Sequence, residues 1–505
     1  MPRGRSETDY ELPRTTTTGA RRPRLSENHL DAGAQVWPDK PGVDAADLAP
    51  SADDAPPTPT PPAAGKKIAA TFLRRGHSLT YVALFVFTVI LYARPAEFYP
   101  SPWTASIAFI LGAVTLAFFL PSQLALEGTL TARPREVSLV LLFCLTGLLS
   151  IPLALSPGTA WETFSDTFIR CVFIFIVMVN VVRTEARLKG MLFLTLLVSI
   201  WLSVGAINDY RLGLMTVEGY RVGGRGSGIF GNSNDMALHL VTILPITIAL
   251  LLGARRLFGK IFYGACGALL IAAIVLTYSR GAFIALMVAF GFMAFKIGRG
   301  HRLGVLLLAF LVIAGLLLFA PGNYGRRIIS IFVPSLDPVG SADARRGELI
   351  RSLHVAARHP LFGIGMGNYA TQMSYRGLVT HNSYTQVAAE MGAAALVLYT
   401  LFILTPLRRL GQMARETFGS RKSSRHYYLA VGLQTSLLAY MVASFFASVS
   451  YQWYVYYLVG YAVCLRRLYE SEKGSAIVPE KKQAKEEERR RRTALARPGV
   501  RAETV

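Results

Sequence analysis

The chain is poor in charge and in cysteine for its length of 505 residues. Only 17% of the residues are charged and 52% are hydrophobic, a balance that excludes an ordinary soluble protein of this size. All of its cysteines fall inside apolar stretches: Cys144, Cys171, Cys266 and Cys464. Their spacing implies neither a disulfide framework nor a metal site, so we expect free thiols that pack as small apolar side chains.

Acidic residues are scarce relative to basic ones, which leaves a net charge of +22. The two polar terminal segments do not supply it, because residues 1–77 hold 11 basic and 10 acidic side chains and residues 470–505 hold 10 and 7. The excess therefore lies in the apolar body and its loops. A charge spread in this way argues against nucleic-acid binding.

The hydrophobic residues gather in blocks close to the roughly 20 residues that cross a bilayer as a helix. This pattern predicts an all-α, polytopic membrane protein with about 12 transmembrane helices. We expect spans at 80–94, 103–120, 138–155, 167–182, 190–207, 236–253, 261–278, 281–297, 303–320, 384–405, 427–447 and 449–465.

The connections between these spans alternate in charge. With the N-terminus inside, every inside connection is basic, whereas the outside connections at 156–166 and 448–451 contain no Lys or Arg. Both ends are therefore expected in the cytoplasm. The predicted organisation is a disordered cytoplasmic tail at 1–77, transmembrane helices at 78–207, a core at 208–405 with a large outer loop at 321–383, transmembrane helices at 406–469 and a charged cytoplasmic tail at 470–505.

Two outer connections, 208–235 and 321–383, contain arginine but no lysine. A topology signal would use both residue types, so an excess of arginine alone favours a need for the planar guanidinium, which binds phosphate oxygens in pairs. The alternative is that long outer loops escape the charge rule and that their arginines are merely solvated.

The first of these connections contains "YRVGGRGSGIFGNSNDMA" at residues 220–237. Arg221 and Arg225 flank glycines that would allow close approach of the backbone to a ligand. Asn232 and Asn234 precede the next span, and we expect Asp235 to cap it.

Further arginines lie at other outer positions. "TYSRGAF" places Arg280 at the tip of a tight outer turn, and Arg170 near the start of the fourth span is interpreted as a snorkelling side chain. In the large loop, residues 343–360 are typical of an amphipathic helix. Its apolar face is loose and consists of Ile350, Leu353, Val355 and Ala357.

His381 stands where the large loop meets the tenth span, followed by Asn382 and Ser383. Imidazole has a pKa of about 6.5 and can accept a hydroxyl proton at neutral pH. Nearby arginines would lower that pKa and keep the ring neutral. The alternative is that His381 only caps the helix that follows. We expect Glu390, further along the span, to be a buried helix contact.

The motifs "RGSGIFGNSNDMA", "SRGAF", "RHPLFGIGMGNY" and "THNSYTQVAAEMG" occur in this order between about residues 200 and 405. In sequence and order they resemble the O-antigen ligase and polymerase superfamily of bacterial membrane glycosyltransferases. One departure is "NSN" at 232–234, where the family often has Asn-Pro-Asn.

The resemblance implies the GT-C class of helical, lipid-linked glycosyltransferases, acting in the bacterial inner membrane. Such enzymes resemble metal-independent, inverting transferases without a cofactor. They move a glycan from undecaprenyl diphosphate to an acceptor hydroxyl on lipid A core, polysaccharide or protein, as in lipopolysaccharide biosynthesis. Arg225 and Arg280 would hold the diphosphate, His381 would be the base, and Arg346 matches the arginine of an "R-x-E-L" stretch.

The predicted site thus comprises His381 as catalytic residue, Arg221, Arg225, Arg280 and Arg346 as diphosphate ligands, and Asn232, Asn234 and Asn382 as supporting residues. No metal and no nucleic acid are expected. Two alternatives remain at this stage: a polymerase of the same superfamily, and a transporter or flippase of lipid-linked glycan, which would show paired repeats or broken helices.

Overall fold

The computed structural model describes residues 64–215, 217, 219–224, 230–297, 324–331, 340–374, 377–419 and 425–473. Within these ranges the chain is helical, and its single β contact is an isolated bridge between Val217 and Arg221. The helices are α1 (Ala64–Ala93), α2 (Pro95–Phe98), α3 (Pro102–Glu127), α4 (Arg135–Ser150), α5 (Pro157–Thr163), η1 (Phe164–Phe168), α6 (Ile169–Val181), α7 (Glu185–Arg211), α8 (Ser233–Gly253), α9 (Leu257–Leu276), α10 (Arg280–Ile297), α12 (Tyr324–Ile329), α13 (Ser341–Arg358), η3 (Tyr369–Met373), α14 (Ser383–Glu416), α15 (Arg425–Ala443) and η4 (Ser444–Phe446). Residues 453–473 are also helical.

Nine stretches of the described chain are helical, long and apolar enough to cross a membrane, which confirms a multi-pass membrane protein. α4 coincides with a further expected span but has only 16 residues, a rise of about 24 Å. The helix at 453–473 includes all but the first four residues of the last expected span, 449–465. The span expected at 303–320 and most of the tails at 1–77 and 470–505 lie outside the described residues. The total of twelve and the disorder of the tails therefore stay predictions.

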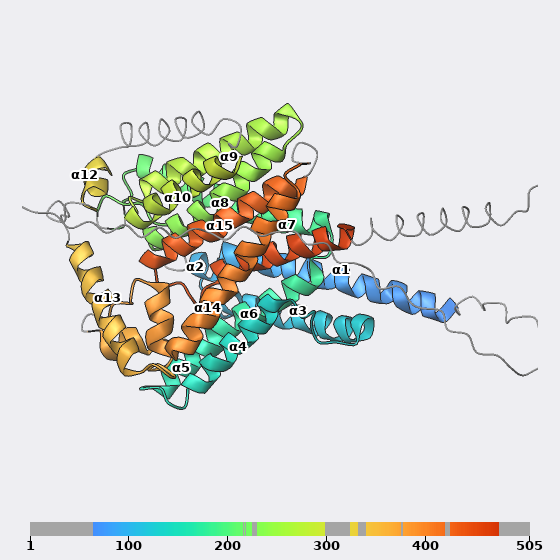
Figure 1. Ribbon diagram of the computed structural model, residues 1–505, viewed down its shortest axis with the longest axis horizontal. Helices are drawn as coiled ribbons and strands as arrows, with labels where there is room; N and C mark the ends of the chain where they lie inside the picture. The colour runs from blue at the N-terminus through green and yellow to red at the C-terminus, as the bar shows by residue number, and fades with distance from the viewer. Residues whose placement is uncertain are drawn as a thin grey trace, which may run out of the picture. The chain divides into compact units, whose positions relative to one another are not determined.

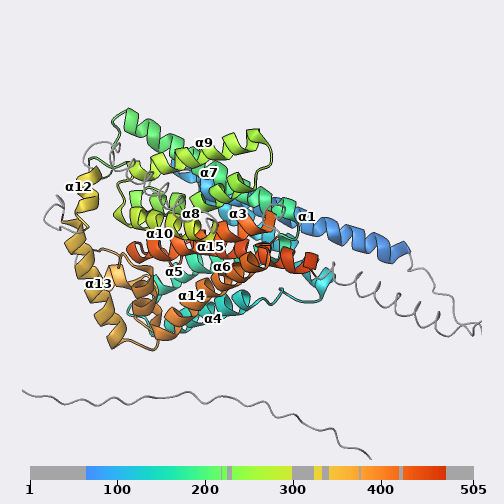
Figure 2. The same ribbon diagram turned by 45° about the horizontal axis from the view of Figure 1, so that its top comes forward.

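Figures 1 and 2 both show α12 and α13 at one end of the helix bundle, which we call the loop end. The start of α1 lies at the opposite end, and so does the end of the helix at 453–473. Both ends of the described chain therefore lie on the same side of the bundle. The described parts of the large loop and the start of α14 lie on the other side.

The short segment 444–449, between α15 and the last helix, is bonded to the start of α14. The Ser383 hydroxyl donates to the Ala447 carbonyl (2.7 Å) and accepts from the Val449 amide (2.9 Å). Three residues before Ser383, the hydroxyl of Thr380 lies 2.8 Å from the hydroxyl of Ser448. All of these groups except that of Ser448 belong to buried residues, so the bonds are shielded from water and hold the start of α14 in place.

The same 444–449 segment also receives the start of α10. A Cβ atom at Gly281 would lie 2.7 Å from the Cβ of Phe446, closer than real side chains approach. Only glycine permits this contact. The glycine of the "SRGAF" motif therefore brings the backbone that carries Arg280 against the same segment that holds α14.

α14 is not a continuous helix. Gly392 has φ 88° and ψ 179°, and the neighbouring backbone groups are bonded to the preceding loop instead of to their own helix. The amides of Ile364 and Gly365 donate to the carbonyls of Ala389 and Glu390, both over 2.9 Å, and the Ala393 amide donates to the Pro360 carbonyl over 2.7 Å. The loop thus replaces the helical bonds lost at the break.

This contact explains part of the glycine-rich stretch "LFGIGMGNY". A Cβ atom at Gly363 would lie 2.3 Å from the Glu390 carbonyl carbon, and one at Gly392 would lie 2.3 Å from the Leu361 carbonyl oxygen. The two glycines let backbone pack directly on backbone. Glu390, expected to be a buried helix contact, is indeed buried, and its carboxylate accepts from the Tyr369 amide (3.3 Å).

We expect Gly392→Ala to lower the free energy of unfolding by about 2–5 kcal/mol, because the change adds left-handed backbone strain to a backbone clash. Denaturant titration of the purified protein in detergent would measure this. Gly347→Ala in α13 is the matched control, since nothing lies within 4 Å of its added methyl group. Equal unfolding midpoints for the two variants would contradict the packing at the break.

Candidate active site at the loop end

Three residues of the described chain other than glycine have left-handed backbone, and each precedes a helix start. They are Arg94 (φ 44°), Tyr278 (φ 51°) and His381 (φ 53°), before α2, α10 and α14. Such a conformation costs roughly 1–2 kcal/mol per residue and persists where the surroundings enforce it, often at functional sites. The starts of α2, α10 and α14 are therefore candidates for a functional site.

The neighbours of His381 hold it in this conformation. Asn382, not His381, is the N-cap of α14, and its side-chain oxygen accepts from the amides of Tyr384 (2.9 Å) and Thr385 (3.0 Å). On the other side, Thr380 is bonded to Ser448. The backbone of the histidine is thus fixed between two buried anchors.

The surroundings of His381 keep its imidazole neutral. The pKa of His381 is lowered to about 4, mainly by burial and also by the positive charge of Arg345, whereas Glu348 opposes the shift. The direction is the one expected from the sequence. Burial, however, contributes more than the arginines, because a half-buried ring loses hydration of its charged form.

The arginine of α13 whose charge acts on His381 is Arg345, whereas the sequence singled out Arg346. Arg346 is exposed, one position further along the helix. The buried residues Glu348, Ser352 and Val355 mark the inward face of α13, and Arg345 lies on that face at the spacing of 3.6 residues per turn. That spacing was the signal that could have identified Arg345.

The predicted apolar face of α13 is mostly wrong. Ile350 is 47% exposed and Leu353 is 52% exposed, whereas Val355 is buried as expected. Glu348 is buried because its carboxylate accepts from the Tyr369 hydroxyl (2.8 Å) and the Ser374 hydroxyl (3.3 Å). A paired carboxylate therefore faces inward where an apolar stripe was expected.

Arg280 begins α10 and extends to α12. Its guanidinium donates to the Ser330 hydroxyl (2.9 Å), which in turn donates to the carbonyl of Arg327 (2.6 Å). The predicted phosphate ligand is thus oriented by the residue that follows α12, at the loop end of the bundle.

Arg327 attaches α12 to the turn before α10. Its guanidinium is buried, donates to the Tyr278 carbonyl (2.9 Å), lies 5.1 Å from the ring centre of Tyr220 and is bonded to the Tyr220 hydroxyl. A buried guanidinium held by an aromatic face and a carbonyl is a packing element as well as a charge. Arg327 and its exposed neighbour Arg326 could not be distinguished from the sequence alone.

Arg221 lies below the surface, with 1% of its area exposed. Its guanidinium donates to the Thr277 carbonyl and to the Asn234 side-chain oxygen, each over 2.9 Å. The Ser279 hydroxyl donates to the same oxygen of Asn234 (3.0 Å). These bonds join the start of α8 to the turn before α10.

Asn232, rather than the expected Asp235, caps α8, and its side-chain oxygen accepts from the Asn234 amide (2.8 Å). The positive charge of Arg345 acts on the carboxylate of Asp235, which was not predicted as a site residue. Arg225, predicted to hold phosphate, lies outside the described residues. Among the residues described, no group of three or more His, Cys, Asp or Glu side chains could hold a metal ion.

The pKa of His381 predicts a dependence of stability on pH. The unfolded state takes up this proton near pH 6.5 but the folded state only near 4, so protons favour unfolding as the pH falls through this window. Above about pH 6.5 the contribution is constant. We expect wild-type protein to lose stability relative to His381→Asn between pH 6.5 and 4, measured by thermal unfolding in detergent.

Asn tolerates left-handed backbone, so this variant keeps the local conformation while removing the titrating group. A difference between the two proteins that does not change with pH would show that His381 titrates normally.

The arrangement at the loop end combines a neutral imidazole, arginines on α10, α12 and α13, and two helix starts joined by the 444–449 segment. A comparison with protein families matches residues 265–400, a range that includes Arg280, α13 and His381, to the family described as O-Antigen ligase. A search of curated proteins found no match to the chain. Over residues 265–400, the chain is similar to the O-antigen ligase family.

Proposed function

We propose that the protein transfers a glycan from a polyprenyl diphosphate, such as undecaprenyl diphosphate, to an acceptor hydroxyl at the outer face of the bacterial inner membrane. The observation that carries this proposal is the position of His381. It is a neutral base in the field of Arg345, and the 444–449 segment joins it to the helix start that bears Arg280.

His381 is the general base of the proposed reaction. The acceptor oxygen attacks the anomeric carbon, the bond from that carbon to the phosphate oxygen breaks, and the hydroxyl proton passes to the imidazole. The electron pair of the broken bond leaves with the diphosphate. Because the acceptor oxygen attacks the face opposite the leaving group, the configuration at the anomeric carbon is inverted. A positioned base of this kind contributes roughly 10²–10⁴-fold to the rate.

The leaving diphosphate gains negative charge, and guanidinium groups stabilise it. Arg280 is the best-supported ligand, with Arg225 and Arg346 as further candidates. The observed bonds of Arg221 support a positioning role through Asn234 instead of direct contact. The helix starts at α8, α10 and α14 add a favourable dipole for an anion.

Asn382 fits a supporting role beside the base. Its side-chain oxygen caps α14, whereas its side-chain nitrogen is buried and has no hydrogen-bond partner among the described residues. A buried donor without a partner is costly, and a substrate oxygen would satisfy it.

In this proposal the loop end faces the outside and both termini lie in the cytoplasm. The basic connections expected inside support this orientation. A polyprenyl diphosphate would place its headgroup at the membrane surface beside the helix starts, with its hydrocarbon chain between or beside the helices.

Two other functions use the same donor. A polymerase of the same superfamily would join repeat units with the same chemistry. A flippase is favoured by one observation, the break in α14 beside the buried Glu390, since transporters use broken helices. Three backbone hydrogen bonds to residues 360–365 hold the chain at the break. They support a fixed break in the helix, and not one that moves as a transporter requires.

Gel analysis of envelope glycans after removal of the protein separates these functions. Lipid-linked polymer would accumulate without a ligase, and single capped units would accumulate without a polymerase. A carrier stalled on the inner leaflet would point to a flippase and against transfer.

We expect His381→Asn to reduce transfer by about 10²–10⁴-fold while the protein stays folded in the membrane, because the variant keeps the backbone but lacks the base. Transfer is measured with purified protein and lipid-linked glycan, and His381→Ala should behave likewise. His354→Asn, an exposed histidine on α13, is the control and should retain full activity. Normal transfer by both His381 variants would eliminate the proposed base.

Arg280→Lys should lower kcat/KM by about 10- to 100-fold, because lysine keeps the charge but cannot form a paired contact with phosphate. Arg225→Lys should have a similar effect. Arg358→Lys, at the exposed end of α13, is the matched control. Full activity of Arg280→Lys and Arg225→Lys would show that neither arginine makes a paired contact with phosphate and that both are solvated loop charges.

A further inference from the structure

A cavity of about 770 Å³, which we call the inner cavity, lies between α7, α8 and α9 at the end of the bundle opposite the loop end. The start of α8 belongs to the loop end, because the Ser279 hydroxyl, in the turn before α10, donates to the side-chain oxygen of Asn234 (3.0 Å). From that start α8 runs for 21 residues, about 30 Å, to Gly253, which lines the inner cavity. In the proposed orientation this end faces the cytoplasm.

Three basic side chains from two separate parts of the chain line the inner cavity. They are Lys189 on α7, and Arg255 and Arg256 in the connection from α8 to α9. None of the described residues of this lining is acidic. Lys189 is paired with Glu185 one turn earlier (2.6 Å), an exposed contact of a kind that contributes little. The lining is therefore positively charged, and its two guanidinium groups suit the paired oxygens of a phosphate.

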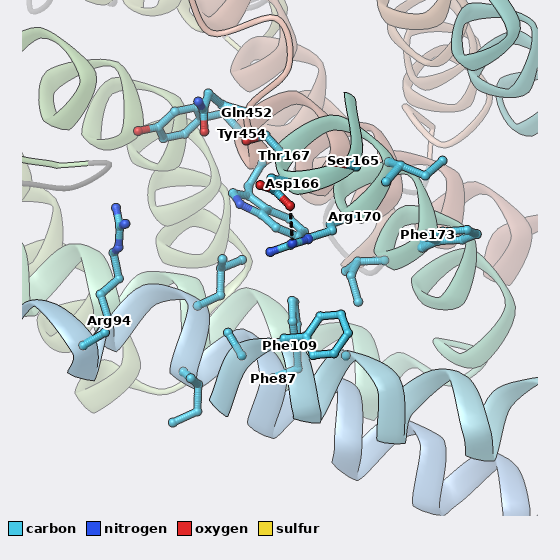
Figure 3. Close-up of a pocket in the computed structure, with 18 of the residues that line it drawn as sticks. Phe87, Arg94, Phe109, Ser165, Asp166, Thr167, Arg170, Phe173, Gln452 and Tyr454 are labelled. Atoms are coloured by element: carbon cyan, nitrogen blue, oxygen red, sulfur yellow. Dashed lines mark hydrogen bonds and ion pairs between the residues drawn. The ribbon is translucent and has the colours of Figure 1, made fainter. Parts of the chain in front are cut away.

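A larger cavity, of about 980 Å³ between α1, α3 and α6, shows the opposite balance of charge. Figure 3 shows Arg170, interpreted from the sequence as a snorkelling side chain, paired with Asp166 (2.7 Å). Arg94 of the same lining is paired with Glu97 (2.5 Å), and Asp235 adds a third acidic residue. Because its cations are already paired within the lining, this cavity does not favour an anion, whereas the inner cavity does.

The basic connections at the inner end are a general signal of orientation, so charge alone does not identify a site there. Arg183 is paired with Glu127 (2.5 Å) and Arg466 with Glu136 (2.7 Å), in each case with a residue of another segment. Those cations are held by the protein itself. The basic side chains of the inner cavity differ, because they line a hollow whose other walls are apolar.

The lining becomes apolar away from the end of the bundle. The deeper walls consist of Phe193 on α7, Leu250 on α8 and Tyr263 on α9, each one or two turns further from the helix end. Phe193 is 42% exposed, and in a membrane protein such a side chain faces lipid, so the inner cavity is accessible from the bilayer beside α7. A basic rim and an apolar interior fit an anion that carries a hydrocarbon chain.

The start of α9 indicates the level of the membrane surface. Leu257 and Phe258 are large, exposed apolar side chains that do not line the inner cavity. Side chains of this kind are stable in the bilayer, whereas the adjacent Arg255 and Arg256 place their charge among the lipid headgroups. The basic rim of the inner cavity therefore lies at the depth of lipid phosphates.

We propose that the inner cavity binds an anionic phospholipid, with its phosphate against the three basic side chains and an acyl chain along the apolar lining. This lipid is a component of the membrane itself and is distinct from the glycan donor, because the inner cavity lies at the end of the bundle opposite His381 and Arg280. The bound lipid joins α7, α8 and α9 on the side where the connections are basic.

The pair of changes Arg255→Gln and Arg256→Gln, made together, tests the role of charge. Both side chains are exposed, so their replacement should not impair folding. The matched control is Arg408→Gln with Arg415→Gln. These two arginines are also exposed and lie near the end of α14, at the same end of the bundle but outside the lining of the inner cavity.

Binding to the full-length protein in detergent is measured by native mass spectrometry with two lipids of equal chain length, anionic phosphatidylglycerol and zwitterionic phosphatidylcholine. We expect wild-type protein to bind phosphatidylglycerol more tightly. The Arg255 and Arg256 variant should bind phosphatidylglycerol about 10-fold more weakly and phosphatidylcholine unchanged. The Arg408 and Arg415 variant should bind both lipids as wild type does.

Gly253→Leu tests the cavity itself without a change of charge. Nothing lies within 4 Å of a Cβ atom added at Gly253, so the leucine side chain enters open space in the lining. We expect it to weaken phosphatidylglycerol binding at least about fivefold. Gly264→Leu in α9 is the matched control, because its surroundings are equally open and it lies outside the lining.

Three results would overturn the proposal. Phosphatidylglycerol binding that is unchanged in the Arg255 and Arg256 variant, or equally weakened in the Arg408 and Arg415 control, would leave only a general attraction between basic side chains and anionic lipid. Unchanged binding in Gly253→Leu would place the lipid outside the inner cavity. Displacement of phosphatidylglycerol by equimolar glycerol phosphate, which has no acyl chains, would assign the site to a free phosphate.

These outcomes are independent of glycan transfer. The residues of the proposed reaction lie at the loop end, and their variants are tested with lipid-linked glycan. Loss of the lipid site therefore leaves the proposed function standing, and the reverse also holds.

Discussion

The loop end of the structure depends on the hydrogen bonds between the 444–449 segment and the start of α14. Ser383 both donates to and accepts from this segment, Thr380 is bonded to it, and Gly281 lets α10 pack against it. Because the bonds are nearly all buried, they resist competition from water. Two helix starts that are about 100 residues apart in the sequence are thereby held beside each other, and the histidine and an arginine of the proposed site come with them.

The second constraint is electrostatic. Buried cations in this protein have specific partners: Arg327 stacks on Tyr220 at the loop end, and at the opposite end Arg466 forms a two-pronged pair with Glu136 (2.7 and 3.3 Å). Pairing offsets the cost of removing these charges from water. At the loop end, the charges that act on His381 are those of Arg345 and Glu348, both on α13.

The third constraint is backbone geometry. His381 adopts a left-handed conformation that costs free energy, and Asn382 and Thr380 stabilise it from either side. Gly363 and Gly392 permit the backbone of the large loop to close the break in α14. The end of the loop is thus tied to the same helix whose start carries the base, so the loop cannot shift without moving α14.

The sequence by itself determined the helical class, the positions of most membrane spans and the set of motifs that carry the family relationship. Those features depend on local composition and on spacing along the chain, which apolar blocks and glycine-containing motifs record directly. The sequence also placed His381, Asn382 and Arg280 at helix starts, because a change from polar to apolar character marks such boundaries.

Only the tertiary structure decided which side chains meet. It selected Arg345 over Arg346, buried Arg327 and Arg221 as packing elements, and moved the cap of α8 from Asp235 to Asn232. It also brought the 444–449 segment, α10 and α14 together and formed the cavity beside α3. Neighbouring residues on a helix differ by about 100° in direction, and contacts between distant segments depend on how helices pack, so neither follows from a single sequence.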